Sequence, residues 1–416
     1  MAPPIRTAVP VSARRRLRVL FFSEAVTLAH LARPLALATA LPPLDYEVRL
    51  AVDPRYSAFL PSLPSPPIPL HSITPERFME SLAQGKPLYD EATLRDYVEQ
   101  DLAVITDVEP DVVVGDFRLS LSVSARLAGK PYISLSNAYW SPYAVRPFVV
   151  PDLPLVRTLG VPVAQGLFSL IRPFAFALHA KPLNRVRSRY GLPALGPNLL
   201  RVYTDADITL YADIPELFPL RNAPPTHRHA GAVLWSPGFE KPSWWETLPP
   251  ERPCVFLSLG SSGQIDRLPM ILEALKKLPI NVVVATAGRT QNLVAAENVF
   301  LADFLPGSET AARASLVICN GGSPMTQLAL TQGVPVLGIC SNMDQHLNMG
   351  GVVRARAGIS LRSGTLNPGV LQRSVQLLMA ESAYQDAAQG LQAAYGRFRA
   401  ERQLRSAIAS LVGHET

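Results

Sequence analysis

The chain has 416 residues, of which 48% are hydrophobic and 17% charged, and its formal net charge is +6. This length is enough for two domains of about 200 residues each, and the composition is that of a soluble protein with large cores. Arginines gather near the N-terminus, and we interpret residues 1–16 as a solvated basic arm rather than a contact for nucleic acid or membrane. No basic stripe interleaved with aromatic residues occurs elsewhere, which excludes nucleic acid as a partner.

Targeting and membrane signals are absent from the sequence pattern. Residues 1–16 lack the apolar core of a signal peptide, and no uncharged apolar stretch reaches the roughly 18–20 residues that span a bilayer. The nearest candidate, Thr158 to Ile171, is too short and contains a proline. We therefore expect a cytoplasmic protein with at most peripheral membrane contact. Three cysteines lie in or beside apolar runs, which indicates reduced thiols and no zinc site: Cys254, Cys319 and Cys340.

In the first half of the chain, apolar runs typical of buried strands alternate with helix-compatible segments. Such alternation implies a parallel sheet covered by helices on both faces. From Asn137 to Leu200 the pattern weakens, because prolines, aromatic residues and leucines dominate. The strands are predicted at Leu17–Phe22, Glu47–Val52, Val112–Gly115, Tyr132–Ser136 and Ile208–Tyr211, and the helices at His30–Leu41, Asp96–Val108 and Leu119–Leu127.

A passage rich in proline and tryptophan, from Pro215 to Pro253, has the character of a linker. The alternation then restarts, and a helix or helix pair is predicted at the end of the chain. The elements are Val255–Leu259, Leu268–Leu278, Asn281–Ala287, Val299–Ala302 and Glu381–Leu411. The predicted division is a basic arm over residues 1–16, an N-terminal domain over 17–235, a linker over 236–253 and a C-terminal domain over 254–416.

The most informative segment runs from Leu316 to Met349. Its turn presents backbone N–H groups at a helix N-terminus, where an anion such as a diphosphate is favoured. Its polar loop follows a strand, at the edge where open α/β sheets bind ligands. In chain order we predict a strand, a glycine turn, a helix, a strand and a polar loop: residues 316–319, 320–322, 324–332, 334–339 and 344–346.

This segment resembles the donor-binding signature of two-domain, inverting GT-B glycosyltransferases of family-1 type, which include the UDP-glucuronosyl and glucosyl transferases and the macrolide and antibiotic glycosyltransferases. Asn320 stands where the family has a histidine, and Gln327 lies near the position of the acid that holds the ribose. The resemblance implies an α/β, GT-B fold: two Rossmann-like domains face across a cleft, and the terminal helix returns to the first domain. The matching residues are Gly321-Gly322, Gly333-Val334-Pro335 and Asp344-Gln345.

The resemblance also implies the chemistry: transfer of a sugar from a UDP- or dTDP-sugar to a hydroxyl of a lipophilic polyketide, terpenoid, carotenoid or lipid. It implies neither a cofactor nor a metal ion. The aromatic stretch over residues 137–182 is read either as core or as the acceptor pocket, with Tyr139, Trp140 and Tyr143 as candidates. The donor candidates are Ser261, Ser262, Phe304, Asn320, Gly321, Gly322, Ser323, Gln327, Asp344 and Gln345.

His30 is the candidate base for the acceptor hydroxyl. It follows the first strand at the start of a predicted helix, where the positive end of the helix favours the neutral imidazole that a base requires. The family places its catalytic histidine after this same strand. Asp116 ends the strand at Val112–Gly115 and could orient His30. The alternatives are structural: His30 as helix padding, and Asp116 as a cap for the helix near Leu119.

Three other interpretations compete with a glycosyltransferase of this mechanism. Asp205-Ala206-Asp207 has the spacing of a metal-diphosphate motif, but a turn before the next strand is favoured. A catalytically silent nucleotide-sugar-binding protein of the same fold would explain Asn320 and the missing acid. A Rossmann oxidoreductase is disfavoured, because no Gly-x-Gly-x-x-Gly follows the first strand.

Overall fold

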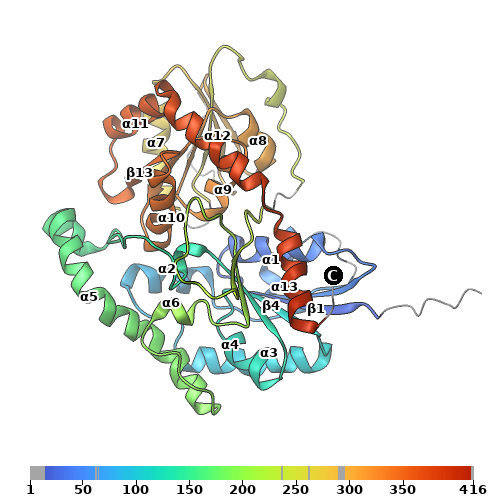
Figure 1. Ribbon diagram of the computed structural model, residues 1–416. Helices are drawn as coiled ribbons and strands as arrows, with labels where there is room; N and C mark the ends of the chain where they lie inside the picture. Colours follow the sequence, from blue (N-terminus) through green and yellow to red (C-terminus); the bar gives the residue numbers. More distant parts are fainter. Residues whose placement is uncertain are drawn as a thin grey trace, which may run out of the picture.

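The computed structural model describes residues 15–60, 63, 65–235, 238–260, 263–288 and 296–413. These residues form two lobes, each built on a parallel β-sheet with helices on its faces (Figure 1). The strand order is β3-β2-β1-β4-β5-β6-β7 in the first sheet and β10-β9-β8-β11-β12-β13 in the second. The expected α/β architecture of two Rossmann-like domains is therefore confirmed.

The N-terminal lobe contains the first sheet, and its central strand β4 is buried along its whole length, as a continuous Val-rich run requires. Its strands are β1 Leu17–Ser23, β2 Tyr46–Val52, β3 Ile68–Pro69, β4 Val112–Asp116, β5 Tyr132–Ser136, β6 Ile208–Tyr211 and β7 His227–His229. Its helices are α1 Leu28–Ala40, α2 Pro75–Gln84, α3 Glu91–Val108, α4 Leu121–Leu127, α5 Pro154–Arg189 and α6 Leu199–Val202.

The C-terminal lobe repeats the arrangement. Its strands are β8 Cys254–Ser258, β9 Asn281–Ala285, β10 Val299–Ala302, β11 Leu316–Cys319, β12 Val336–Cys340 and β13 Gly358–Arg362. Its helices are α7 Leu268–Leu275, α8 Gly307–Arg313, α9 Ser323–Thr331, α10 Met343–Arg354, α11 Pro368–Ala380 and α12 Ser382–Gly396, and α13 Ala400–Val412 follows them.

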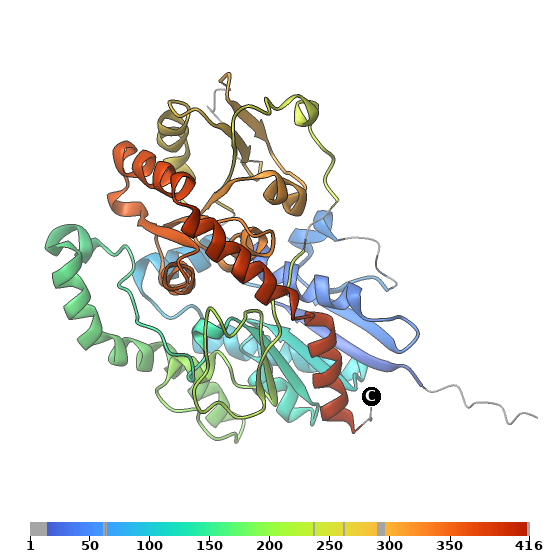
Figure 2. The ribbon, with the colours of Figure 1, turned by 45° about the horizontal axis from the view of Figure 1, so that its top comes forward.

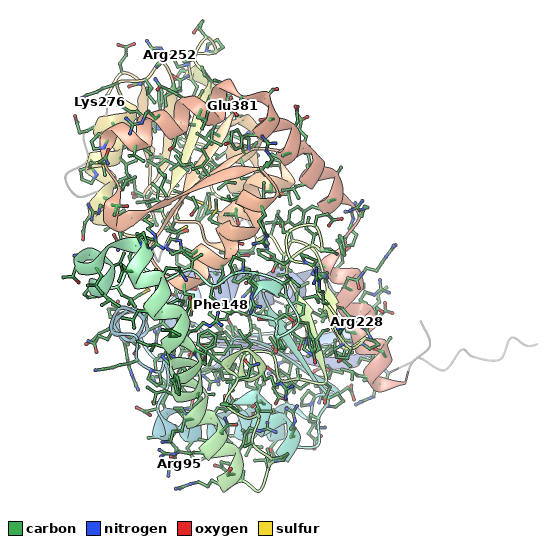
Figure 3. All side chains as sticks on the ribbon, turned by 60° about the vertical axis from the view of Figure 1, so that its left-hand side comes forward. Arg95, Phe148, Arg228, Arg252, Lys276 and Glu381 are labelled. Atoms are coloured by element: carbon green, nitrogen blue, oxygen red, sulfur yellow. The ribbon has the colours of Figure 1, made fainter. Side chains whose placement is uncertain are left out.

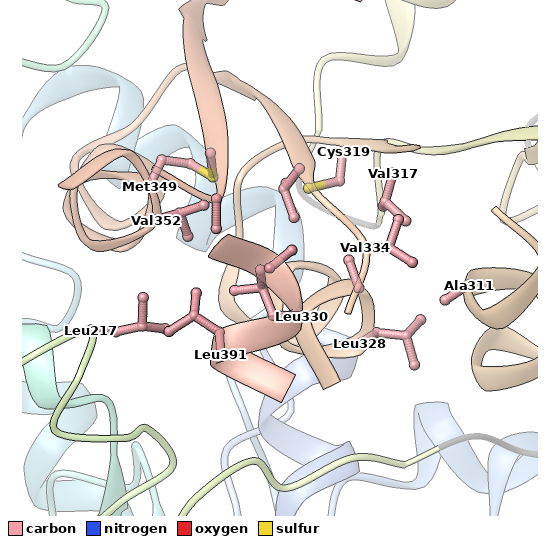
Figure 4. Packing of buried hydrophobic residues seen from close by; sticks show 14 of the residues in the cluster. Leu217, Ala311, Val317, Cys319, Leu328, Leu330, Val334, Met349, Val352 and Leu391 are labelled. Atoms are coloured by element: carbon pink, nitrogen blue, oxygen red, sulfur yellow. The ribbon is translucent and has the colours of Figure 1, made fainter. Parts of the chain in front are cut away.

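Two features join the lobes. Leu217 and Phe218 of the first lobe belong to the same buried hydrophobic cluster as Leu330, Met349 and Leu391 of the second (Figure 4). The last helix, α13, leaves the second lobe after α12 and packs beside α1, β4 and β6 of the first (Figure 2). Its buried residues complete the core around the first sheet and include Leu404 and Ile408.

The structure corrects three expectations. The stretch from Asn137 to Leu200 contains the long helix α5, whose prolines are accommodated partly because Gly160 breaks the helical path with φ 73°. The proline-rich passage after Pro215 contributes the edge strand β7 to the first sheet. Residues 344–346 lie in the first turn of α10 and not in a loop, because Asn342 caps that helix.

The structure adds one observation to the expectation about membrane-spanning segments. Among the described residues, α5 is long and apolar enough to cross a membrane by length and composition. The uncharged stretch ends at Ile171, but the helix continues through Arg172 and Pro173 into a second apolar segment. Of the predicted basic arm, residues 1–14 lie outside the described residues, and Arg15 pairs with Asp111.

The turn between β11 and α9 has no room for a side chain. Gly321 has φ +81°, a left-handed conformation that a residue with a Cβ rarely adopts. A Cβ added there would stand 2.6 Å from Cys340 Sγ and 2.8 Å from Met349 Cγ, both of which are buried. Backbone strain and a steric clash therefore act together at this turn.

Gly321→Ala should destabilise the protein by about 2 kcal/mol or more, because it adds both the strain and the clash. Gly390→Ala is the matched control: Gly390 lies in α12 with nothing within 4 Å of the added Cβ, so alanine should be neutral or stabilising by up to about 1 kcal/mol. Thermal unfolding of the two variants measures both effects. Equal unfolding midpoints would contradict the tight packing of this turn.

Candidate active site

His30 and Asp116 meet at the carboxyl edge of the first sheet. Asp116 is the last residue of β4, and its register partner is Ser23, the last residue of β1. His30 lies in the first turn of α1, two residues after the helix begins at Leu28. The distance from His30 Nδ1 to Asp116 Oδ1 is 2.8 Å. Helix α4 has Ser120 as its N-cap, so Asp116 serves His30 and not a helix terminus.

Arg33 holds the carboxylate of Asp116 from the other side. Its Nε donates to Asp116 Oδ2 at 2.7 Å, and its Nη2 donates to Oδ1 at 2.9 Å. Asp116 is completely buried, and a buried carboxylate needs such a bidentate partner. Burial lowers the pKa of Arg33, but attraction and hydrogen bonding to Asp116, together with Tyr139 and Asp213, outweigh it and raise that pKa, so the guanidinium stays charged.

This arrangement determines which ring nitrogen of a neutral His30 carries the hydrogen. A carboxylate only accepts hydrogen bonds, so Nδ1 of a neutral His30 carries the hydrogen and donates it to Asp116. Nε2 then holds the lone pair, as in a neutral histidine poised as a base. The ring itself stacks on Phe117, with the centroids 4.8 Å apart and the planes at 15°.

A buried ion cluster supports the loop that carries Phe117. The next residue, Arg118, is fully buried, and it donates to Glu24 Oε2 at 2.9 Å and to Asp101 Oδ1 at 3.0 Å. Its guanidinium also lies 3.5 Å from the ring centroid of Tyr97. Phe117 has φ 56°, a strained conformation for an aromatic residue that persists only where its surroundings fix it. The Arg118 cluster provides that constraint.

Hydrogen bonds connect this site to the second lobe. Arg33 Nη1 donates to Asn137 Oδ1 at 2.7 Å, and Asn137 Nδ2 donates to Ser323 Oγ at 2.9 Å and to Asp213 Oδ2 at 3.1 Å. Gln327 donates from its amide to Asp213 Oδ1 at 3.3 Å and to the carbonyl before Asp213. Two predicted donor residues, Ser323 and Gln327, are therefore buried contacts between the lobes.

The engagement of Gln327 corrects its expected place. Its side chain is 2% exposed, and its amide hydrogens point to the first lobe, so it does not stand in the cleft as a substitute for the ribose-binding acid. The sequence pattern placed it correctly on the helix after the glycine turn. Only the approach of Asp213 from the other lobe determines which way the side chain is used.

The glycine turn is built as expected and braced by α10. Gly322 N donates to Asn320 Oδ1 at 3.0 Å, and Asn348 Nδ2 donates to the carbonyl of Gly321 at 2.8 Å. Pro324 occupies the second position of α9 and has no N–H group. The N–H groups on either side of Pro324 belong to the first helical turn, which leaves them without intrahelical partners and suited to an anion.

Asp344 and Gln345 make different contacts. Asp344 Oδ1 accepts from Trp140 Nε1 of the first lobe at 2.7 Å. Gln345 Oε1 accepts from the backbone N–H groups that precede α10, at 2.8 and 3.3 Å, and completes its capping box. Burial lowers the pKa of the neighbouring His346 to about 4, so that residue is neutral at physiological pH.

The remaining donor candidates are placed in part. The ring of Phe304 stacks on Phe239 at 4.8 Å and meets Phe59 edge-on at 5.9 Å. The contact with Phe59 joins the loop after β10 to the first lobe. Its role in donor binding stays a prediction; the resemblance implies that the backbone of this segment contacts the nucleobase. Ser261 and Ser262 lie outside the described residues.

Phe117, whose ring stacks on His30, belongs to an aromatic cluster. Phe117 meets Phe78 edge-on at 6.2 Å and Tyr203 at 5.3 Å, and Tyr89 lies 6.3 Å away. These residues come from α2, the segment before α3, and the end of α6, none of which the sequence pattern connected with an acceptor. They give the surroundings of His30 an apolar, aromatic character.

The three predicted acceptor residues have different positions. Trp140 is half-buried and packs edge-on against Tyr203 at 5.2 Å, which connects it to the aromatic cluster around Phe117. Tyr139 is 1% exposed and packs against Phe218 in the core between the lobes, so it presents no surface to an acceptor in this structure. Tyr143 packs against the first residue of β7, at 4.9 Å between ring centroids.

Both aspartates of the Asp-x-Asp sequence are used within the first lobe. Asp205 accepts from Arg126 at 3.1 Å and from Arg187 at 3.0 Å, and Asp207 accepts the backbone N–H of Tyr132 at 2.8 Å. Within the described ranges, no group of three or more His, Cys, Asp or Glu side chains is arranged to hold a metal ion. The turn interpretation of these residues fits their contacts.

The sequence pattern missed three residues of the site. Asn137 directly follows β5, and Asp213 is the second residue after β6. Each therefore stands at the same sheet edge as Asp116. That rule, applied to every strand, would have found both. Arg33 lies three residues after His30 on an otherwise apolar helix, and this spacing puts the two side chains on one helix face.

Known proteins of similar sequence are glycosyltransferases. The family described as "Erythromycin biosynthesis protein CIII-like, C-terminal domain" matches residues 269–396. A PGL/p-HBAD biosynthesis rhamnosyltransferase of Mycobacterium bovis (strain BCG / Pasteur 1173P2) is 51% identical over 392 residues, which cover 94% of this chain and 87% of that protein. The chain belongs to the GT-B glycosyltransferases of family-1 type.

Other relatives of this glycosyltransferase bear on its fold and activity. The structure of the spinosyn forosaminyltransferase SpnP matches with a TM-score of 0.70 at 17% identity, over 96% of this chain and 100% of that one. The spinosyn rhamnosyltransferase SpnG, complexed with thymidine diphosphate, matches with a TM-score of 0.66 at 18% identity, over 94% and 99%. A relative in the same M. bovis strain is named inactive; it is 50% identical over 64% of this chain and 73% of its own length.

The stability of this glycosyltransferase should fall with pH because of Asp213. Burial raises the pKa of Asp213 from 3.8 to about 7, so the folded protein keeps a proton that the unfolded chain has released. The contribution of Asp213 to the free energy of unfolding therefore falls as the pH rises from about 4 to about 7, and it is constant above about pH 7. Asparagine at position 213 cannot ionise. The unfolding temperature of Asp213→Asn, relative to that of the parent protein, should therefore rise between about pH 4 and about pH 7.

Thermal unfolding of both proteins at several pH values between 4.5 and 8.5 measures the difference. Other buried acids such as Glu24 and Asp101 are the same in both proteins, so their contributions cancel in it. Parallel stability profiles would show that Asp213 ionises normally.

Proposed function

We propose that this glycosyltransferase moves a sugar, by inversion and without a metal ion, from a nucleoside diphosphate to a hydroxyl of a lipophilic acceptor. The observation that carries the proposal is the His30–Asp116–Arg33 arrangement, in which a charged arginine holds the carboxylate and the carboxylate orients the histidine. A purely structural histidine would not need a buried carboxylate with its own bidentate partner.

The proposed reaction begins at His30. Its Nε2 takes the proton of the acceptor hydroxyl as the oxygen attacks the anomeric carbon, while the bond from that carbon to the diphosphate breaks. The glycosidic bond forms on the opposite face of the sugar, the nucleoside diphosphate leaves, and the imidazolium later returns its proton to solvent. Asp116 stabilises the imidazolium while it exists, because their 2.8 Å hydrogen bond becomes charge-assisted.

The diphosphate would leave toward the first turn of α9. Ser323, the first residue of that helix, is bonded to Asn137, which in turn contacts Arg33. The chain of bonds from His30 to the helix N-terminus therefore sets base and leaving-group site in a fixed relation. The helix supplies partial positive charge without a metal ion.

The acceptor is proposed to be a lipophilic molecule, and rhamnose is the sugar that the M. bovis relative's name suggests. Two observations support the apolar acceptor. Phe117 stacks on His30 and is connected through Tyr203 to Trp140, and the M. bovis relative of 51% identity is named a PGL/p-HBAD biosynthesis rhamnosyltransferase.

A silent nucleotide-sugar-binding protein is the second candidate. The name of the inactive relative and the presence of Asn320 at the turn favour it. It predicts donor binding without turnover in any variant. Activity measurements therefore separate the two functions directly.

His30→Ala should lower turnover by about 10²–10⁴-fold with nearly unchanged donor affinity, because it removes the base and leaves the donor site intact. Asp116→Asn should cost less, since the base remains. The assay uses dTDP-rhamnose and UDP-glucose as donors, a panel of lipophilic phenols and alcohols as acceptors, and excess EDTA throughout.

Near-normal turnover of His30→Ala would remove His30 from the mechanism, and a greater loss in Asp116→Asn would reverse the assigned roles. Activity that appears only when Mg²⁺ replaces EDTA would overturn the metal-independent mechanism. Binding of a donor without transfer or hydrolysis under any condition would favour the silent protein.

The donor should carry either ribose or deoxyribose with little distinction. No acidic residue occurs between Asn320 and Gln332, and Gln327 is engaged by Asp213, so the 2′-hydroxyl lacks a charged partner on α9. A charge-assisted bond contributes about twice a neutral one, so its loss limits the preference for UDP to roughly tenfold. The structure of SpnG with thymidine diphosphate is consistent with a deoxyribose donor in this fold.

Parallel calorimetric titrations with UDP-glucose and dTDP-glucose measure that preference, and His30→Ala serves as the control because it should retain both affinities. We expect dTDP-glucose to bind at least as tightly. A hundredfold preference for the UDP-sugar would mean that a residue outside α9 holds the ribose.

A further inference from the structure

Helix α5 presents an apolar stripe to solvent. Six of its large hydrophobic side chains are exposed, and five of them, from Val163 onward, form a stripe after the break at Gly160. Phe174 is 77% exposed and Leu170 is 73% exposed, and they are joined by Val163, Ile171 and Leu178. Only 6% of the most apolar window of this helix is buried. An exposed patch of this size and continuity marks an interaction surface.

The spacing of these residues puts them on one side of the helix. Leu170 and Ile171 follow Val163 by seven and eight residues. Phe174 follows them by four and three, and Leu178 follows Phe174 by four. At 1.5 Å per residue the stripe from Val163 to Leu178 is about 22 Å long. In Figure 3 the helix runs along the outer side of the molecule, with Phe148 labelled beside it.

The same face becomes basic toward the end of the helix. Lys181, Arg185 and Arg189 continue the stripe at spacings of four residues, and they line an open groove with Glu91. Glu91 lies 4.0 Å from Arg185 and 3.5 Å from Arg189, so it balances one of the three charges. The helix itself contains no Asp or Glu over its 36 residues. An anion therefore complements this end.

The opposite side of α5 fixes the helix to the protein. Phe176, Ala180, Leu183 and Val186 are buried in the core that α5 shares with α3 and α6. Arg172 lies 4.1 Å above the ring of Phe148. Crossing a bilayer would expose these buried groups, so the helix suits a position along a membrane surface rather than through it.

We propose that α5 docks the enzyme on a membrane that contains anionic lipids. The apolar stripe enters the boundary between headgroups and acyl chains, and the basic groove of Lys181, Arg185 and Arg189 receives lipid phosphates. This pairing of an apolar stripe with an unopposed basic end is the pattern of helices that lie in the membrane interface. Docking requires no sugar transfer, so it stands or falls independently of the proposed function.

Docking would also suit a lipophilic acceptor. Helix α5 packs on α3 and α6, and Tyr203, which directly follows α6, belongs to the aromatic cluster around Phe117. The docked face and the proposed acceptor surroundings therefore belong to one lobe, and an acceptor held in the membrane would have a short path to His30.

Flotation of the full chain with vesicles tests the proposal. Vesicles of phosphatidylcholine alone are compared with vesicles containing 30% phosphatidylglycerol, a ratio chosen for the experiment, at low and high salt. We expect binding to the anionic vesicles, and a fall in the partition coefficient of about tenfold or more in Leu170→Glu/Phe174→Glu. Lys181→Glu/Arg185→Glu should remove the preference for anionic vesicles.

Matched controls carry the same changes elsewhere. Leu44→Glu/Leu377→Glu replaces exposed leucines outside α5, and Lys276→Glu/Lys277→Glu reverses two exposed charges on the second lobe. Neither control should alter vesicle binding, and circular dichroism verifies that all four variants fold. Absence of vesicle binding by the parent protein, or equal binding by Leu170→Glu/Phe174→Glu, would overturn the proposal.

Light scattering coupled to size-exclusion chromatography tests whether a second copy of this chain, and not a membrane, covers the stripe. A dimer of the parent protein that dissociates in Leu170→Glu/Phe174→Glu, without vesicle binding, would assign the stripe to a second copy of this chain and overturn membrane docking. A monomer that floats with anionic vesicles supports it.

Discussion

The buried ion pair of Arg33 and Asp116 is the constraint on which the site depends. A carboxylate with no exposure to water requires a charged, two-pronged partner, and Arg33 meets this requirement from the same helix face as His30. Asp116 accepts from Arg33 through both of its oxygens, and Oδ1 also pairs with Nδ1 of His30. The third nitrogen of Arg33 extends the constraint to Asn137 and thereby to the second lobe.

The contact between the lobes has consequences for donor recognition. Ser323 and Gln327 come from the helix that follows the donor turn, yet both bond to residues of the first lobe. The two lobes therefore share the hydrogen bonds through which the donor helix is positioned. A change in lobe separation would break the bonds from Asn137 to Ser323 and from Gln327 to Asp213 together.

Aromatic and aliphatic residues of the first lobe are packed around Phe117 but exposed along α5. Phe117 stacks on the ring of His30, and aromatic residues from three further segments pack around Phe117. Along α5, aliphatic and aromatic residues remain in solvent, although burying them would stabilise any folded protein. A chain that leaves Phe174 exposed while it buries Phe176 two residues later separates an inward face from an outward one by the geometry of a helix.

The sequence by itself determined the alternating strands and helices, the glycine turn and the positions of His30 and Asp116 after their strands. These are local properties: apolar periodicity, a glycine with left-handed φ, and the rule that side chains after parallel strands share one sheet edge. It did not determine α5, because three prolines and a break at Gly160 obscure its helical pattern. It also did not determine which partner the side chain of Gln327 takes, and it missed Arg33, Asn137 and Asp213. Which hydrogen bonds these residues make depends on how closely the two lobes approach, and that distance is set by long-range packing such as Leu217 and Phe218 against the second lobe.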